Sequence, residues 1–458
     1  MGLEAQQPTA IIPLTSIASE VPRRPEAREV IQFDGVVVVG ARIAGSIAAY
    51  NLARHNIPVL CLDSQDVRIE TSPSCTGCGG LVQNKTMELL ETIGISLESV
   101  TRQVMDGYTV HLPHGGILKV STPGMLALDR GFGPAKGDKR LGLDAFLLQT
   151  AIKAGVRFEV DPVEKIDLGQ NGRAIVTTKN HIYSANFVMG AFGHSSIQEK
   201  ISVPEGYKLD SAKTQKSAVY EFAIDPDFYE KNYDSKVRVV VVPMHRKDQN
   251  ALFVAFVPKG NNRVSMIVLG KKDVTPNDII NLMASKYVTG LLPEDMLGED
   301  QRWKKPVDKG GCNQCACTKN TITTRTPEHF AVLIDGGIVN IGDSAVTRLY
   351  KDGIGAAAFN AIRATNAYIN KTLPEYVQEA KSLFPPDDHI WARILMELND
   401  LAVRFPWSER RLIYLHNGNT LISPLVREHA RKMLIGEDSY QNILSGFVHH
   451  ALELAFHH

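Results

Sequence analysis

A strand, a glycine turn and a helix follow one another near the start of the chain. GVVVVG (35–40) is a short run of β-branched apolar residues, typical of a strand buried in a parallel sheet. GSIAAYNLARHN (45–56) then predicts a helix, and PVLCLD (58–63) predicts a second buried strand. Two parallel strands need a crossover connection, which a β-α-β unit of about 30 residues provides. The sequence therefore predicts an α/β fold of the Rossmann type.

The turn between this strand and this helix has the pattern of a dinucleotide site. Gly40 permits a tight turn and Gly45 lets the helix pack close to the strand, so the helix N-terminus presents N–H groups to a pyrophosphate. Asp63 ends the second strand, where a carboxylate accepts hydrogen bonds from ribose hydroxyls. The alternative is a glycine turn that serves packing alone. The predicted nucleotide-binding residues are Gly40, Arg42, Ala44, Gly45, Asp63 and Ser64, with Arg42 at the usual middle glycine.

VNIGDSAVTRLYKDGIGAAAFNAI (339–362) has a Gly-Asp pair at the end of a predicted strand and an Asp-Gly-x-Gly turn before a helix. This segment resembles the late flavin motif of the superfamily that contains FAD-dependent monooxygenases, halogenases and geranylgeranyl reductases. The resemblance implies that the cofactor is FAD and that Asp343 binds its ribityl chain. It also implies that the glycine turn brings backbone N–H groups to the N1/O2 edge of the flavin. The residues so implied are Gly342, Asp343, Gly353, Ile354 and Gly355.

LDSQDVRIETSPSCTGCGGLV (62–82) resembles a segment of the geranylgeranyl reductase family in which an Asp, an Arg and a Cys-Gly pair lie beside the isoalloxazine. The resemblance implies that Cys78 takes the position of the active-site cysteine of the family, and Arg68 that of its basic residue. The other flavin-binding residues that it implies are Gly79, Gly80 and Arg140.

Two further segments bear on the reaction. FVAFVPKGNNRVSMIVLG (253–270) resembles the substrate-sheet signature of the same family, although Ala255 and Val257 stand where the family has aromatic residues. VMGAFGHSS (188–196) has Phe192 and Gly193 where NADPH-using aromatic hydroxylases have Asp-Gly. The second departure favours a reductase over a hydroxylase.

Five of the six cysteines lie in two short clusters. Cys75 and Cys78 have the spacing C-x-x-C, and CNQCAC (312–317) repeats this spacing and adds one thiol. We find neither an apolar run of about 18 residues nor a signal peptide, so we expect a cytoplasmic, reducing location without a transmembrane segment. In that location clustered cysteines indicate redox or metal chemistry more than structural disulfides.

Three roles for the cysteines are open. In the first, Cys75–Cys78 or Cys312–Cys315 forms a redox dithiol that exchanges electrons with FAD. In the second, the two C-x-x-C pairs hold an iron–sulfur cluster or zinc. In the third, only Cys78 is active and the other thiols are packing and loop residues. We predict that Cys75 or Cys78 lies close to Cys312 or Cys315, and that Cys61, in the second strand, is an inert core residue.

The rest of the chain predicts an α/β fold with an α+β insert. Alternating apolar runs between residues 217 and 270 are typical of an antiparallel sheet. We therefore expect a Rossmann-like FAD-binding domain, an antiparallel-sheet substrate domain and a helical C-terminal region. The expected parts are a flexible N-terminal arm (1–33), the FAD-binding domain (34–105, 136–200 and 311–372), the substrate domain (a hairpin, 106–135, and 201–310) and the helical region (373–458).

The leading functional hypothesis is an NAD(P)H-driven reductase of a hydrophobic or unsaturated, isoprenoid-like substrate, with Cys78 near the reacting face of the flavin. One alternative is an electron-transfer flavoprotein for a partner protein in sulfur, lipoyl or iron–sulfur metabolism, and another is an FAD monooxygenase. The 50 Lys and Arg balance the 50 Asp and Glu, so charge gives no indication of nucleic acid binding. ILSGFVHHALELAFHH (443–458) is amphipathic, and we expect a docking helix or homodimer contact rather than a metal site.

Overall fold

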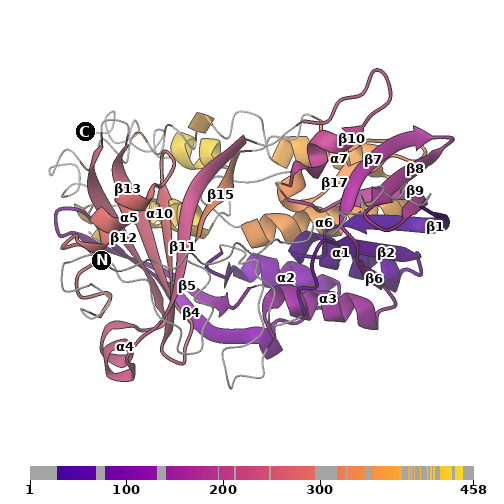
Figure 1. The fold of residues 1–458 in the computed structure, drawn as a ribbon. Coiled ribbons are helices and arrows are strands. Elements are labelled where there is room, and N and C mark those ends of the chain that lie inside the picture. The colour runs from indigo at the N-terminus through magenta and orange to yellow at the C-terminus, as the bar shows by residue number, and fades with distance from the viewer. Residues whose placement is uncertain are drawn as a thin grey trace, which may run out of the picture.

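Two sheets dominate the molecule, one carrying helices α1, α3 and α6 and the other helices α4, α5 and α10 (Figure 1). The structure is a computed structural model. It describes residues 28–68, 78–130, 141–193, 195–210, 213–246, 249–293, 317–324, 329–345, 353–383, 423–435 and 439–446, with single helical residues between 390 and 417.

The first sheet has a parallel centre. Its path is β10-β7-β8-β9-β1-β2-β6, and β17 joins β9 on the parallel side. β1 pairs in parallel with β2 and with β9, and β2 pairs in parallel with β6, which confirms the predicted β-α-β unit. The strands are β1 (Val30–Val39), β2 (Val59–Asp63), β6 (Arg157–Val160), β7 (Val163–Gln170), β8 (Arg173–Thr178), β9 (Ile182–Gly190), β10 (Ile201–Ser202), β16 (Ala331–Val332) and β17 (Ile338–Asn340).

Helices pack on one face of the parallel strands β1 and β2, and residues of the antiparallel β7-β8-β9 meander pack on the other. On the helical face, α1 (Ile43–Arg54), α3 (Leu143–Lys153) and α6 (Gly353–Asn370) bury Ile47, Leu147 and Ile362 in one core with Val36. On the meander face, a second core contains Val37 and Tyr183. A fully buried aliphatic side chain contributes about 1.5–3 kcal/mol, so burial on both faces explains why these strands are apolar throughout.

The second sheet follows the order β15-β11-β14-β13-β12-β4-β5-β3. Its pairs are antiparallel except β4 with β12, which are parallel, so the predicted antiparallel sheet contains one parallel joint. Helices α4 (Pro226–Asn232) and α5 (Pro276–Met283) lie on one face, and α10 (Ser423–Ile435) packs on the other. The strands are β3 (Leu81–Val82), β4 (Thr101–His111), β5 (Ile117–Leu128), β11 (Lys213–Ala223), β12 (Lys236–Arg246), β13 (Gln249–Pro258), β14 (Arg263–Gly270) and β15 (Cys317–Thr324).

Several predicted boundaries differ from the observed strands. β10 lies in the expected substrate domain but pairs with β7 of the first sheet, and β3 lies in the expected FAD-binding domain but pairs with β5 of the second sheet. β1 begins at Val30, inside the expected arm 1–33, because residues 30–33 pair in parallel with residues 182–185 of β9. β15, inside the expected third part of the FAD-binding domain, pairs with β11 and so extends the second sheet. Of the helices in the described ranges, none combines the length and hydropathy that a membrane span requires.

Candidate functional site

The turn after β1 is built so closely that its glycines cannot be replaced. Gly40 has a φ of +104°, in the left-handed region that favours glycine. A Cβ on Gly45 would overlap the carbonyl oxygen of Gly40, so α1 begins directly against the turn. Asp63, at the end of β2, accepts the N–H of Ala41 at 2.7 Å and that of Gln65 at 3.0 Å. The same carboxylate that the sequence predicts for ribose therefore also fixes the shape of the turn.

The late Gly-Asp pair lies against the start of α1. Gly342 has a φ of +59°, and a Cβ placed on it would lie 2.7 Å from the Cβ of Ala44. Asp343 follows in a short 3-10 turn, η5 (Gly342–Ser344), and is partly buried. Burial raises the pKa of Asp343 to about 6, and the positive charge of Arg130 works against this rise. The Gly40 turn, the start of α1 and the Gly342–Asp343 pair thus lie together and form one site, which we call the cradle.

Arg130 is the central cation of this cradle, and the sequence analysis missed it. Its Nη2 donates to both oxygens of Asp144, at 3.0 and 3.2 Å, and the Asp144 side chain is fully buried. Arg42, which precedes α1, lies 3.6 Å from the same carboxylate. Burial opposes the charge of Arg130, but Asp144 and Cys78 outweigh it, so the pKa of the guanidinium lies above its usual range. Arg130 thus joins Asp144, Cys78 and Asp343.

The segment Cys78–Gly80 connects this cradle to the second sheet. The Cys78 sulfur accepts the N–H of Gly80 at 3.4 Å and lies beside Arg130. A Cβ on Gly79 would overlap the side chain of Ile267 in β14, so the segment is pressed against the sheet. The Gly80 carbonyl accepts the N–H of Leu128 at 2.8 Å. The structure therefore places Cys78 where the two sheets meet.

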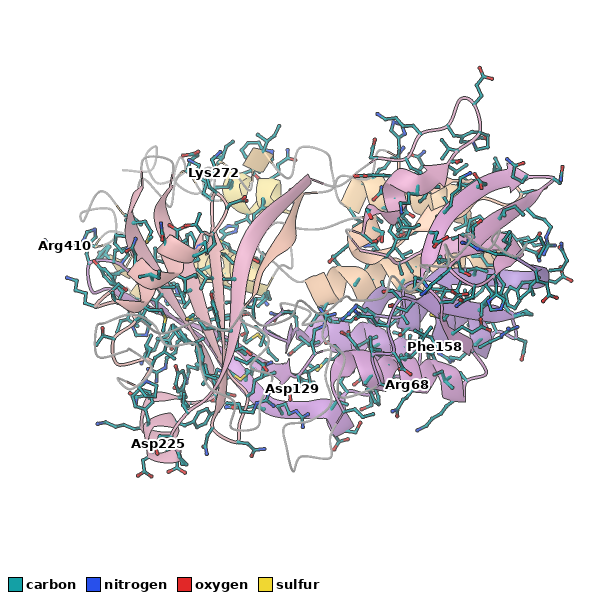
Figure 2. All side chains as sticks on the ribbon, in the orientation of Figure 1. Arg68, Asp129, Phe158, Asp225, Lys272 and Arg410 are labelled. Atoms are coloured by element: carbon teal, nitrogen blue, oxygen red, sulfur yellow. The ribbon has the colours of Figure 1, made fainter. Side chains whose placement is uncertain are left out.

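The other predicted residues have different surroundings. Arg68 donates to Asp66 at 2.8 and 2.6 Å and lies over the ring of Phe158 at 5.1 Å, and no contact within the described ranges links it to Cys78 (Figure 2). Cys61 is buried in the core of the first sheet, as predicted, and burial raises the pKa of its thiol. Ser64 contacts Asp63 at 3.4 Å. Ile354 is buried in the first turn of α6, between Gly353 and Gly355.

The cysteine clusters are only partly described. Cys75, Cys312, Cys315 and Arg140 lie outside the described residues, as do the side chain of Cys317 and most of the C-terminal segment 443–458. The convergence of the two clusters therefore stays a prediction, as do the redox-dithiol and metal roles.

A buried network of charges lies on the second-sheet side of the cradle. Asp129, shown between the two sheets in Figure 2, accepts from Arg102 and Arg263 at 2.8 Å each and lies 3.5 Å from Lys259. Glu221 binds Lys259 and accepts from Arg263 at 2.9 Å. The signal in the sequence is the presence of these charges in or directly beside strands with apolar runs, but only the fold shows that they contact one another.

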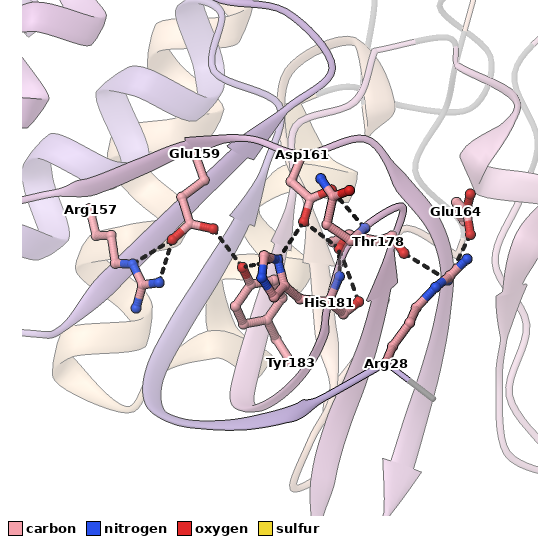
Figure 3. Close-up of polar contacts among 9 residues, drawn as sticks. Arg28, Arg157, Glu159, Asp161, Glu164, Thr178, His181 and Tyr183 are labelled. Atoms are coloured by element: carbon pink, nitrogen blue, oxygen red, sulfur yellow. Dashed lines mark hydrogen bonds and ion pairs between the residues drawn. The ribbon is translucent and has the colours of Figure 1, made fainter. Parts of the chain in front are cut away.

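A second polar cluster lies at the corner where β6 leads into β7 (Figure 3). Within the described ranges, Glu159, Asp161 and His181 form the one group whose ligand-type atoms lie within 4.8 Å of one another, as a metal site requires. However, Asp161 already accepts from Thr178 at 2.5 Å and from His181 at 3.0 Å, and Glu159 accepts from Tyr183 at 2.5 Å. These bonds tie the corner to the β8–β9 turn, and we interpret the cluster as structural.

This interpretation predicts that Asp161→Ala lowers the free energy of unfolding by about 1.5–3 kcal/mol, because several donors lose a charged acceptor. Incubation of the wild type with EDTA should leave its Tm unchanged. Urea unfolding of the variant and thermal unfolding of the wild type with and without chelator measure the two effects. A Tm that falls on chelation and returns with Zn²⁺ would show that the cluster holds a metal.

Comparison with known proteins identifies the architecture. Residues 35–269 match the family model described as FAD binding domain. A search of curated protein sequences found no match. Solved structures match with TM-scores above 0.5 and identities that show the fold alone.

Three of these structures illustrate the range of chemistry on this fold. A geranylgeranyl bacteriochlorophyll reductase-like protein from Thermoplasma acidophilum has a TM-score of 0.56 at 16% identity, covering 91% of this chain and 96% of that one. The p-nitrophenol 4-monooxygenase of Pseudomonas putida has 0.57 at 15% identity, covering 88% and 98%. A flavin-dependent brominase has 0.54 at 15% identity, covering 87% and 93%.

Proposed function

We propose that this chain, which belongs to the FAD binding domain family and is an FAD-dependent oxidoreductase, works as a reductase. Its substrate is hydrophobic and unsaturated, and NAD(P)H is the electron donor. The observation that carries the proposal is the position of Cys78. It lies beside Arg130 at the cradle, and the next two residues pack against the substrate-side sheet.

The residues of the cradle fit FAD. The Gly40 turn and the start of α1 leave no room for side chains, which is what close approach of a pyrophosphate requires. In addition, the Nε of Arg130 is buried and has no acceptor in the described part of the chain, so a donor is available for a cofactor acceptor. The residues that would hold FAD are Gly40, Arg42, Ala44, Gly45, Asp63, Ser64, Gly342, Asp343, Gly353, Ile354 and Gly355, joined by Arg130.

Bound FAD supplies hydride and electron transfer between the donor and the substrate. The residues of the chain position the reacting groups and shield them from water. Gly79 allows the segment of Cys78 to lie directly on Ile267, and Gly80, with a φ of +69°, turns the chain into β3. This arrangement brings the thiol to the boundary between cofactor and substrate sides.

The sheet face above this segment supports an apolar substrate. Val239, Ala255, Val257 and Ile267 belong to one hydrophobic cluster of that face, which α10 also joins. Ala255 and Val257 are smaller than the aromatic residues of the geranylgeranyl reductase family at the same positions. We therefore propose a substrate with an apolar body that is bulkier near these two residues than the family's own.

Anaerobic titration of the purified protein with NADH or NADPH tests the reductase. We expect the oxidised flavin absorbance to bleach, and slow release of peroxide when oxygen is admitted, without a hydroxylated product. Stoichiometric oxygen insertion into an aromatic substrate would instead establish a monooxygenase, the activity of one structural neighbour.

Cys78→Ser tests the role of the thiol. Serine has a similar size but is a far poorer nucleophile, so we expect turnover to fall at least tenfold while FAD stays bound. Cys61→Ser in the core serves as a comparison for the loss of a thiol, and its loss should affect stability rather than turnover. Because the Cys61 sulfur lies 3.9 Å from the Gly40 carbonyl, FAD retention is measured for this variant as well. Full turnover of the Cys78 variant would return this residue to a packing role.

A further inference from the structure

Arg130 contacts both Cys78 and Asp144 at the cradle. A guanidinium has five N–H donors in a fixed plane. Nη2 is used by Asp144, whereas the buried Nε finds no acceptor among the described residues. The side chain is therefore held in place at one end and retains a donor for a further partner.

The two neighbouring carboxylates bind different sets of cations. Asp129 precedes Arg130 in the chain but binds Arg102, Lys259 and Arg263 on the side of the second sheet. Asp144 faces Arg130 and is shared with Arg42.

The remaining groups near the cradle come from three other elements. Asp343 in η5 is near enough for the charge of Arg130 to oppose the rise of its pKa, and Cys78 lies beside Arg130 from the segment before β3. Lys259, directly after β13, has its Nζ 3.5 Å from the position of a Cβ on Gly80. Two cations, Arg130 and Lys259, thus lie close to the segment 78–80.

We propose that Arg130 stabilises the reduced form of the bound FAD. Reduced flavin carries a negative charge at its N1/O2 edge, and a fixed cation in a poorly hydrated site favours the state with that charge. The inference rests on the proposed function, because that function brings the flavin ring beside Cys78. The sequence resemblance pointed instead to Arg68 as the basic residue of this site.

The test compares midpoint potentials of the holoenzyme, measured anaerobically against a reference dye. Arg130→Gln removes the charge, and we expect two-electron reduction to become about tenfold less favourable, which lowers the potential by about 30 mV. Arg130→Lys keeps a cation and should recover most of the loss. Arg173→Gln is the matched control, since Arg173 also makes several side-chain hydrogen bonds but lies in the meander of the first sheet.

A second measurement separates this role from phosphate binding. FAD and ADP share a pyrophosphate, so the apoprotein is titrated with each. If Arg130→Gln weakens FAD and ADP equally and leaves the potential unchanged, Arg130 serves the pyrophosphate and the inference is wrong. If the wild-type apoprotein binds no FAD in this titration, the proposed function itself is wrong. The binding titration shows this, independently of the midpoint potential. If the potential falls in Arg130→Gln and recovers in Arg130→Lys, the inference is supported.

Discussion

Asp129→Asn is expected to lower the free energy of unfolding by about 3–5 kcal/mol, because it leaves Arg102, Lys259 and Arg263 buried with one carboxylate fewer. Urea unfolding at pH 7 measures the change. Asp225→Asn is the matched control: Asp225 caps α4 on the surface, accepting the N–H groups of residues 227 and 228 at 3.0 and 3.1 Å. Asn is an equally good cap, so this control should change stability by only a few tenths of a kcal/mol.

The pH dependence of the same variant gives a second check. Burial alone would raise the pKa of Asp129, but Lys259, Arg263 and Arg102 outweigh it and hold the pKa below its usual value. A carboxylate with a lowered folded pKa contributes stability at neutral pH, and this contribution is lost as the pH falls from the unfolded pKa through the folded one. Below about pH 4 the gap between wild type and Asp129→Asn should therefore narrow. A gap under 1 kcal/mol at pH 7 would show that water solvates the network.

Asp343→Asn is expected to stabilise the cofactor-free protein, most strongly above pH 6, while weakening FAD binding. Burial raises the pKa of Asp343 from 3.8 to about 6, so the folded state favours the neutral acid and loses stability as the pH rises between these values. The difference of roughly 2 pKa units corresponds to at most about 3 kcal/mol. Asn avoids this cost, and unfolding of the apoprotein at pH 5 and pH 8 should show a gain at both, with the gain at pH 5 about half of that at pH 8.

FAD binding by the same variant should move in the opposite direction. A hydrogen bond to a charged group contributes about 1.5–3 kcal/mol, so the Kd for FAD should rise about 10- to 150-fold. Fluorescence titration of the apoprotein measures it. Unchanged FAD affinity would remove Asp343 from the cofactor site, and unchanged apoprotein stability at pH 8 would show that its carboxylate is solvated.

Local pattern predicted the parts of the fold that depend on neighbours in sequence. The apolar strand, the glycine turn and the helix at residues 35–56 each have their own signal, and the observed β1 and α1 follow them. Pairing direction has no such signal. The expected hairpin (106–135) and the alternating runs between residues 217 and 270 predict strands, but nothing in either segment shows that β4 and β12 run parallel.

The same distinction applies to the site. Gly40, Gly45 and Gly342 were recognisable because glycine at a tight turn leaves a sequence signature. Arg130 was not, since a single arginine acquires its role only through contacts with Asp144 and Cys78, which come from other segments. Arg68 illustrates the converse: its place in the order Asp, Arg, Cys suggested the flavin, whereas its side chain turns back to Asp66, two residues earlier.

The contact between Ala44 and Gly342 affects the order in which the chain folds during synthesis. β1 and α1 are made early, but β17, η5 and α6, which complete the first sheet and its cradle, are made only after the strands of the second sheet up to β15. During translation at about 5–20 residues per second, β1 and α1 are made many seconds before β17, η5 and α6. The second sheet has most of its strands in the intervening stretch and can form first. The nascent chain therefore acquires its cofactor late, and fragments that end before residue 342 should be unable to retain FAD.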